Sequence, residues 1–395
     1  MPACPAYGVS PRESIAPRGQ VYNIRAWLEG RLPLGHGLAD EIYDCLACRG
    51  CESVCPAGVP VGSIMEDARS LVTDARAESF FLRASKRVML EGVVARPALL
   101  SLAITFLRWA ERLGLRAAAR RVFGERMALL PPIPRRSPPL PEVVPSERKR
   151  RKRVALFTGC IASHLFADVN EATARVLARN GFEVIVPRRQ VCCGALHLHN
   201  GLSKAGGKLA RANIDAFEPL GADAVIVNAA GCGAVLTEYG ELLEGDPRAV
   251  SLARSVVDVS AFLVREGFEA PSKGLGSVRI AYDAPCHLFH GQRVRSEPRE
   301  LLSRIPGVEL VDYRDSERCC GSAGIYNVIR YDMSMKVLET KMRELETTRA
   351  DVIATGNPGC LLQLSEGVRR SGIGAEVAHP IVLLDRAYRQ SSLAG

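Results

Sequence analysis

The sequence lacks any apolar run long enough to cross a bilayer. The longest run, Leu99–Leu107, is about half the required length and is followed by Arg108. We therefore expect no transmembrane helix. A helix of the protein core is the favoured interpretation of this run, and an interfacial helix resting on a membrane is the alternative. The opening residues also lack the basic and apolar regions of a secretory signal, so we expect a cytoplasmic protein, with a peripheral position on the inner face of the cytoplasmic membrane as a variant.

Outside one short segment the chain has little net charge. The formal net charge is +9, and residues 135–153 contain eight basic and two acidic side chains, so this segment holds six of the nine excess charges. The near-neutral remainder has no electrostatic footprint for nucleic acid. For the basic segment itself, the solvated end of a linker is favoured over a surface for nucleic acid or anionic lipid.

The sequence also shows no flavin, nicotinamide or phosphate-binding loop. The glycines of segment 201–208 resemble a phosphate loop, but Gly207 stands where that motif has lysine. We therefore find no site for hydride chemistry. If an organic substrate is oxidised, a partner must supply the flavin.

Cysteine, in contrast, is abundant. The chain has 395 residues, of which 47% are apolar and 24% charged, and 13 are cysteines. This composition is typical of a folded protein of about two or three domains. An odd number of thiols without a secretory signal does not suit a disulfide framework, so clustered metal ligands are expected. The thiols form three groups: Cys4, Cys45, Cys48, Cys51 and Cys55; Cys160, Cys192, Cys193 and Cys232; Cys286, Cys319, Cys320 and Cys360.

The second and third groups belong to an internal repeat of about 127 residues. In each repeat three β-rich apolar runs alternate with helical patterns, and a cysteine position follows each run. Such alternation predicts a parallel, helix-covered sheet of the Rossmann-like type. Because the carboxyl ends of parallel strands share one edge, we expect the thiols of a repeat to meet there. The predicted strands are 154–158, 182–186 and 222–227, then 278–282, 308–312 and 350–354.

The first group contains a ferredoxin motif. Residues 45–56 have the spacing C-x2-C-x2-C-x3-C-P, which bacterial ferredoxins use for [4Fe-4S] clusters. Structural zinc sites usually have two separated pairs of ligands, and thiolates without interleaved histidine favour iron-sulfur. In two-cluster ferredoxins the fourth cysteine serves the other cluster, so Cys4 is the candidate partner of Cys45, Cys48 and Cys51. Cys55 is then left over, which points to a start placed too late; a single retained cluster is the alternative.

Each repeat carries Cys-Cys-Gly between two single cysteines. One such pair could be packed core thiols or a vicinal disulfide, but two copies in register favour one cluster per repeat. Gly194 and Gly321 are expected to let the backbone approach a bulky inorganic ligand, and helix N-termini at the same edge suit an anionic cluster. The nearby histidines could contact a substrate, quinone or cluster, but hydrogen-bonding or surface roles are favoured: His197, His199, His287 and His290.

These features predict an α/β fold with an N-terminal all-α part. Residues 131–145 contain seven prolines, which exclude a helix or central strand and mark a stiff linker. We expect a helical ferredoxin-like 4Fe-4S domain followed by two repeated Rossmann-like cysteine-rich domains. The expected boundaries are 1–66 for the ferredoxin-like domain, 67–130 for a helical segment, 131–153 for the basic linker, and 154–275 and 276–395 for the repeats.

Five segments of the chain match one known family: Ser14–Tyr22, Cys45–Pro56, Pro285–Val294, Cys319–Asn327 and Gly356–Cys360. Through them the whole chain resembles the iron-sulfur subunit of bacterial glycolate oxidase. The resemblance implies electron transfer from an FAD-binding oxidase subunit, which oxidises glycolate or another 2-hydroxyacid, to a membrane acceptor of the quinone type. It also implies that all 13 cysteines are cluster ligands, with one or two clusters in the ferredoxin-like domain.

The cysteine-rich domain is shared with several families, so it indicates a class of protein rather than a substrate. The heterodisulfide reductase pattern ends each domain in C-x2-C, and here Ala229 and Asn357 replace the first cysteine of that pair. This departure argues against a catalytic thiol-disulfide or heterodisulfide reductase. The same domain would also suit an iron-sulfur subunit of a lactate or anaerobic glycerol-3-phosphate dehydrogenase. A zinc-stabilised protein that binds nucleic acid through the basic segment is the non-enzymatic hypothesis.

Overall fold

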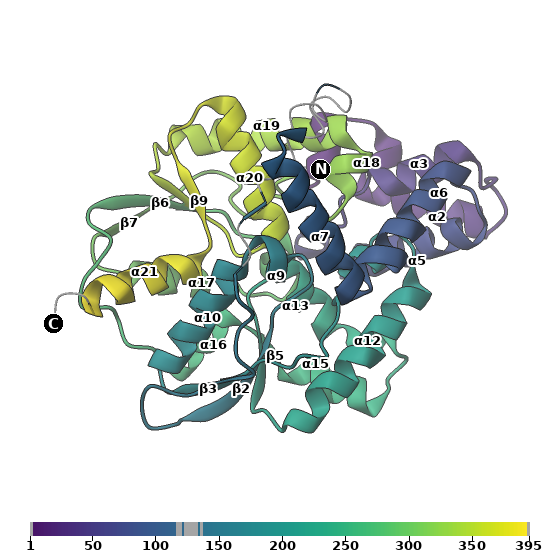
Figure 1. Ribbon diagram of the computed structural model, residues 1–395. Coiled ribbons are helices and arrows are strands. Elements are labelled where there is room, and N and C mark those ends of the chain that lie inside the picture. Colours follow the sequence, from purple (N-terminus) through teal and green to yellow (C-terminus); the bar gives the residue numbers. More distant parts are fainter. Residues whose placement is uncertain (1–2, 116–120, 122–132, 135–136, 393–395) are drawn as a thin grey trace.

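The computed structural model describes residues 3–115, 121, 133–134 and 137–392. Helices of the N-terminal third pack beside two α/β units, each of which has its own sheet (Figure 1). The predicted fold class, an α/β protein with an N-terminal all-α part, is therefore confirmed.

The N-terminal part is helical and has a small core of its own. Pro5 and Pro17 stand in the first turns of two helices, where no backbone N–H is needed. Ile24, Ile42 and Met65 are buried together between these helices. The elements are α1 (Pro5–Val9), the 3-10 helix η1 (Glu13–Ile15), α2 (Pro17–Leu28), α3 (His36–Asp44), α4 (Gly50–Ser53) and α5 (Val61–Asp74).

Three further elements connect this part to the repeats: α6 (Phe80–Arg87), the π-helix η2 (Val88–Val94) and α7 (Pro97–Arg112). The interpretation of the apolar run as a core helix is wrong. Helix α7 buries only Leu100 and Ile104, while Leu102 and Phe106 are 65% and 71% exposed. The reason is that this helix carries apolar residues on all of its sides, whereas only one side of it packs against the rest of the protein.

No single described helix is long and apolar enough to span a membrane. The segments Phe80–Val94 and Pro97–Arg112 pass the same test of length and composition only as a pair, and they are bent by 102° relative to each other. The remainder of the predicted helical segment, 116–120 and 122–130, lies outside the described residues.

The first repeat contains a sheet with the strand order β1-β3-β2-β4-β5. All neighbouring strands are parallel except β1, which is antiparallel to β3. The strands are β1 (Val143–Val144), β2 (Lys152–Phe157), β3 (Phe182–Ile185), β4 (Ala224–Val227) and β5 (Val256–Asp258). The helices are α9 (Ala162–Leu165), α10 (Ala167–Arg179), α11 (Ala195–Leu198), α12 (Ser203–Phe217), η4 (Glu218–Leu220), α13 (Ala230–Thr237), α14 (Tyr239–Leu242), α15 (Pro247–Ser255) and α16 (Val259–Glu266).

The second repeat has a fully parallel sheet in the order β7-β6-β8-β9. This order corresponds to β3-β2-β4-β5, so the sequence repeat is also a structural one. The six predicted strands are present, and each unit gains a short fourth parallel strand. The elements are β6 (Val278–Tyr282), the π-helix η5 (His287–Gly291), α17 (Glu297–Ser303), β7 (Val308–Val311), α18 (Tyr326–Ile329), α19 (Tyr331–Thr347), β8 (Val352–Ala354), α20 (Pro358–Ser371), β9 (Glu376–Ala378) and α21 (Pro380–Ser392).

The two repeats pack through equivalent helices. Helix α10 contacts α21, and α16 contacts α17, so each unit contributes an early helix (α10 or α17) and its last helix (α16 or α21) to the joint. One hydrophobic core continues across it and includes Phe262 and Ile381. At its edge Arg175 binds Asp385 with two contacts, Nε to Oδ1 at 3.0 Å and Nη2 to Oδ2 at 2.9 Å. The joint therefore holds the carboxyl edges of both sheets in a fixed relation.

The end of the proline-rich segment belongs to the first sheet. Strand β1 lies at the sheet edge, a position that neighbouring prolines allow. The basic run that follows pairs with acidic residues of the same unit: Lys152 Nζ lies 2.7 Å from Glu266 Oε1, and Arg153 Nε lies 3.0 Å from Glu183 Oε1. These pairs favour the linker interpretation over a nucleic acid surface.

Candidate metal centres

Four thiols of the N-terminal part line one small cavity. Two of them come from the loop between α3 and α4, the third lies in α4 itself, and the fourth is the N-cap of α1. Ala47 and Arg49 have left-handed φ angles of 49° and 61°, which curl this loop tightly. The cavity-lining thiols are Cys4, Cys45, Cys48 and Cys51.

The surroundings of these thiols suit thiolate ligands that bind iron. Tyr7 N–H donates to Cys4 Sγ at 3.4 Å, and Ala47 N–H donates to Cys45 Sγ at 3.3 Å. Burial, together with the neighbouring Cys45 and Cys4 thiols, raises the pKa of Cys51 to about 12. Thiolates are thus unfavourable here without a cation. Iron ions would displace the protons and supply the missing charge, so the residues fit a thiolate-bound cluster.

Cys55 lies apart from this cavity. The backbone N–H groups of Val59, Ala57 and Gly58 point at its thiol and lower its pKa. Among the five cysteines of the first group, the structure therefore brings four together and leaves Cys55 without another thiol beside it.

In each repeat four thiols contact one another in the same order along a row. Cys320 Sγ and Cys360 Sγ are 3.4 Å apart. Each row begins after β2 or β6, passes through the Cys-Cys pair and ends in the helix that follows β4 or β8. The rows are Cys160, Cys192, Cys193 and Cys232 in the first repeat, and Cys286, Cys319, Cys320 and Cys360 in the second.

The rows differ from the ligand shell of a single ion. Among the described residues, no three Cys, His, Asp or Glu side chains converge as they would on one bound metal ion. The four thiols of each set instead form a row or line a cavity, and this arrangement suits a larger inorganic cluster.

The N-terminal loop covers the thiols of the second repeat. Leu46 packs against Cys286 and Cys319, and Tyr326 OH donates to Asp44 O at 3.0 Å. All four thiols of the second row are buried, whereas Cys160 and Cys232 of the first row are partly exposed. The loop and the second row are close enough for the Cys286 thiol to help raise the pKa of Cys48, after burial itself.

Asn357 connects the two rows. Its Nδ2 donates to Cys360 Sγ at 3.4 Å, and its Oδ1 accepts from Gly231 N–H at 3.1 Å, beside Cys232. At the position where the reductase pattern has a fifth thiol, the side chain is thus a hydrogen-bond donor to sulfur. The equivalent Ala229 of the first repeat has no such group.

Three of the histidines form hydrogen bonds between the repeats and the helices that precede them. Their hydrogen-bonding role is confirmed for three of them: His197 Nε2 lies 3.0 Å from Leu90 O, His199 Nδ1 2.8 Å from Glu66 Oε1, and His290 Nδ1 2.7 Å from Ser53 Oγ. His287 Nδ1 lies 3.5 Å from Cys286 Sγ, and its buried Nε2 has no hydrogen-bond partner in the described part of the chain.

The backbone conformation gives a further reason why glycine follows each Cys-Cys pair. Gly194 and Gly321 adopt left-handed φ angles of 96° and 93°. A Cβ at Gly321 would lie 2.6 Å from Ser334 O in α19. Glycine is therefore required for the turn and for the close approach of that helix.

Sequence reasoning missed a buried ion pair beside the second row. Lys341 Nζ lies 2.5 Å from Asp283 Oδ1, and both side chains are 2% exposed. Tyr313 OH also donates to Asp283 Oδ1, at 2.9 Å. Burial alone would lower the pKa of Lys341, but Asp283 and the nearby thiols raise it. The only signal in the sequence is one lysine at a buried position of the amphipathic helix 331–347.

Comparisons with known families agree with this arrangement. Residues 1–59 match the 4Fe-4S dicluster domain, and residues 154–237 and 280–365 match the cysteine-rich domain. The helical part and the paired cysteine-rich units thus define an iron-sulfur oxidoreductase subunit with [4Fe-4S] clusters.

Similar whole proteins identify the family. The chain is 37% identical over 394 residues to the "Probable glycolate oxidase iron-sulfur subunit" of Bacillus subtilis, covering 95% of this chain and 89% of that protein. It is 33% identical over 397 residues to the "Glycolate oxidase iron-sulfur subunit" of Escherichia coli, covering 98% and 91%. The chain belongs to the family of glycolate oxidase iron-sulfur subunits. A "Lactate utilization protein A" of Shouchella clausii is 32% identical over 233 residues, covering 57% and 95%.

Proposed function

We propose that each set of four grouped thiols holds one [4Fe-4S] cluster. The observation that carries this proposal is the grouping of the thiols: four around one cavity, and four in each of two equivalent rows. The clusters supply one-electron chemistry. The chain's own residues hold them through thiolates, with backbone N–H donors at Cys4 and Cys45 and the Asn357 amide at Cys360. Cys55 would serve a second ferredoxin-type cluster only with ligands that this sequence does not contain.

We further propose the two electron-transfer partners. An FAD-binding oxidase subunit would oxidise glycolate or a related 2-hydroxyacid and donate electrons to this chain, because the sequence has no flavin loop of its own. A quinone-type acceptor at the inner face of the cytoplasmic membrane would receive them. The names of the relatives, which are subunits of an oxidase, support a partner of this kind.

Metal analysis of single variants tests the cluster assignment. The chain is reconstituted anaerobically, and its iron, acid-labile sulfide and visible absorbance are measured. Cys48→Ser, Cys193→Ser and Cys320→Ser each affect a different set and should each lose about one four-iron cluster. Cys55→Ser is the matched control and should keep the iron content of the unmodified chain.

Two outcomes would contradict the proposal. A chain that binds zinc in place of iron would be a zinc-stabilised protein. A chain that reduces a disulfide without a flavoprotein partner would be a reductase, in spite of Ala229 and Asn357.

A further inference from the structure

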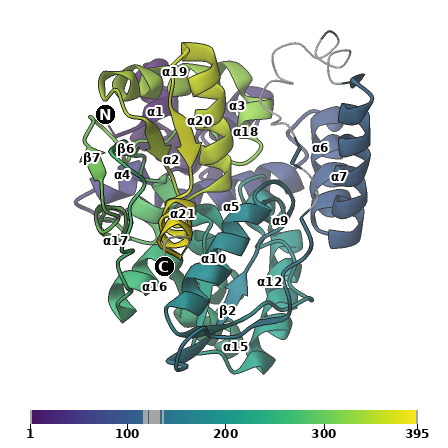
Figure 2. The ribbon, with the colours of Figure 1, turned by 60° about the vertical axis from the view of Figure 1, so that its left-hand side comes forward.

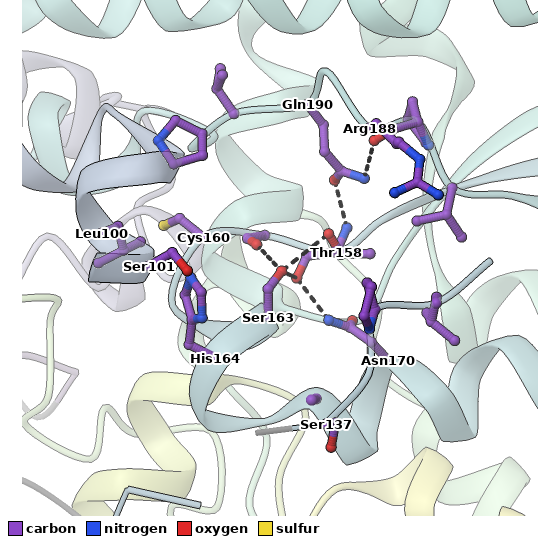
Figure 3. A pocket seen from close by; sticks show the side chains of 18 of the residues that line it. Leu100, Ser101, Ser137, Thr158, Cys160, Ser163, His164, Asn170, Arg188 and Gln190 are labelled. Atoms are coloured by element: carbon purple, nitrogen blue, oxygen red, sulfur yellow. Dashed lines mark hydrogen bonds between the residues drawn. The ribbon is translucent and has the colours of Figure 1, made fainter. Parts of the chain in front are cut away.

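A pocket of about 480 Å³ opens beside the thiols of the first repeat (Figure 3). Cys160 and Cys192 line it at the carboxyl edge of the sheet, and Pro97, Leu100 and Ser101 line it from helix α7. Figure 3 shows Leu100 and Ser101 on the same side of the pocket as Cys160. A molecule in this pocket would therefore contact both α7 and two of the thiols.

The second repeat is covered at the corresponding edge. There, Leu46 of the N-terminal loop packs against Cys286 and Cys319, and all four thiols are buried. In the first repeat Cys160 is partly exposed. Of the two rows, the first is thus the one that a small molecule can reach.

The lining of the pocket suits a neutral ring that carries a few oxygen atoms. Its polar side chains already bond within the protein: Gln190 Oε1 accepts from Thr158 N–H at 2.8 Å, and Ser163 Oγ donates to Thr158 Oγ1 at 3.2 Å. The Arg188 guanidinium is paired with Glu142. Arg108, which also lines the pocket, donates through Nε to Pro134 O at 2.9 Å, and Asn170 Nδ2 donates to Thr158 O at 3.0 Å. Proline, leucine, valine and alanine side chains form apolar walls beside these groups, and both guanidiniums that line the pocket already have partners within the protein.

The other side of α7 faces away from the protein. In Figure 2 this helix runs along the outer edge of the molecule. We define the apolar face as the exposed large apolar residues of α6, η2, α7 and the turn after it. They are Phe80, Phe81, Val88, Met89, Leu99, Leu102, Phe106, Leu107, Trp109, Leu113 and Leu115.

Exposed arginines flank this apolar face. Arg87, Arg96 and Arg112 are exposed, and Glu91 is the exposed acid among them. Leucine, phenylalanine and tryptophan beside basic residues are typical of a helix that lies in a membrane interface, and the excess of positive charge favours anionic lipid over neutral lipid.

We propose that the apolar face rests on an anionic lipid bilayer and that the pocket behind α7 takes the ring of a lipid-soluble quinone. This inference rests on the proposed electron-transfer function and adds the place at which electrons leave. The quinone takes two electrons from the reduced protein, one at a time, and two protons from water. The products are the quinol and the oxidised protein.

Tryptophan fluorescence tests the lipid contact. The chain has two tryptophans, so the full-length Trp27→Phe variant reports on Trp109, which is 63% exposed. Vesicles of brominated phosphatidylglycerol should shift its emission to shorter wavelength and quench it at least twofold. The matched control, Trp109→Phe, reports on Trp27 and should not respond. Unchanged Trp109 emission with vesicles, or a change only when the flavoprotein subunit is added, overturns the lipid contact.

Two tryptophan substitutions on the same helix test the pocket. Ser101→Trp fills the pocket, whereas Thr105→Trp places the same side chain at an exposed position one turn further on. Each reconstituted, reduced protein is mixed with decylubiquinone or with ferricyanide, which needs no pocket. We expect Ser101→Trp to slow reoxidation by decylubiquinone at least tenfold and to leave iron content and reoxidation by ferricyanide unchanged. Thr105→Trp should behave as the unmodified chain.

The outcomes separate this inference from the proposed function. Equal rates of reoxidation by decylubiquinone in the two variants overturn the assignment of the pocket as the quinone site. An unmodified chain that ferricyanide oxidises and decylubiquinone does not overturns the pocket but leaves electron transfer intact. A chain that binds no iron overturns the proposed function and this inference with it.

Discussion

Asn357 Oδ1 accepts a hydrogen bond from the backbone N–H of Gly231 at 3.1 Å, across the joint between the two cysteine-rich units. The neighbouring Ala230 N–H donates to Gly356 O at 3.1 Å. Two N–H groups at the start of helix α13 are thus capped by the other repeat, next to Cys232. A residue that departs from the reductase pattern thereby joins the two thiol rows.

Two substitutions at Asn357 separate its roles. Asn357→Asp keeps the acceptor for Gly231 but loses the donor to Cys360 Sγ, whereas Asn357→Ala loses both. Because N–H donors stabilise the more negative, reduced form of a cluster, both variants should lower the midpoint potential of the second-repeat cluster. Only Asn357→Ala should also weaken the joint, by about 1 kcal/mol.

Redox titration followed by electron paramagnetic resonance, together with thermal unfolding, checks this prediction. The cluster of the N-terminal loop serves as the internal reference, and its potential should not change. Equal potentials of the second-repeat cluster in the variants and the unmodified chain would show that the contact between Asn357 and Cys360 has no electronic effect.

The buried pair of Lys341 and Asp283 predicts a large loss of stability in a single variant. Lys341→Met leaves a buried carboxylate without its counter-charge, which costs roughly 3–5 kcal/mol. Adding Asp283→Asn should recover most of that loss, because the charge is then gone. Lys336→Met, at an exposed position of the same helix, should change the free energy of unfolding by less than about 0.5 kcal/mol.

Denaturant unfolding under anaerobic conditions measures these differences. If Lys341→Met and Lys336→Met were equally stable, the pair would have no structural role.

The sequence predicted the features that depend on local spacing. The loop spacing of Cys45, Cys48 and Cys51 and the strands before each repeat cysteine are local patterns, and the structure contains the corresponding loop and strands. Contacts between distant segments were not predictable in this way. An apolar pattern shows that α7 has apolar sides but not which side meets protein. The partners of Asn357 and Lys341 are far away in the sequence, and no local pattern indicates them.

Cys55 should be the most reactive thiol of the reconstituted protein. The N–H groups of Val59, Ala57 and Gly58 stabilise its thiolate and lower its pKa. Alkylation by iodoacetamide should therefore reach its plateau at a lower pH than that of a free cysteine, whose pKa is about 8.5. Peptide mass spectrometry across the neutral range measures the labelling of each cysteine. In Cys55→Ser the label should disappear while the iron remains, and a label spread over the other twelve cysteines would contradict the proposed ligand sets.

His379 predicts a loss of stability in acid. Its Nε2–H donates to Asn228 O at 2.9 Å and its Nδ1 accepts from Ile381 N–H at 3.0 Å, so the structure fits the neutral ring. Burial lowers the pKa of His379 to about 4, whereas an unfolded chain has a histidine pKa of about 6.5. As the pH falls, the unfolded chain therefore takes up this proton first. The stabilisation is complete above pH ~6.5 and is lost as the pH falls towards about 4, by about 3 kcal/mol.

His379→Gln tests this acid dependence, because glutamine can donate and accept at similar positions without titrating. The free energy of unfolding of this variant, measured across the same pH window, should fall less steeply than that of the unmodified chain. His36→Gln, at an exposed position, is the matched control and should keep the original slope. If His379→Gln kept that slope too, the acid sensitivity would arise elsewhere, and the joint between the repeats would not depend on a neutral ring at His379.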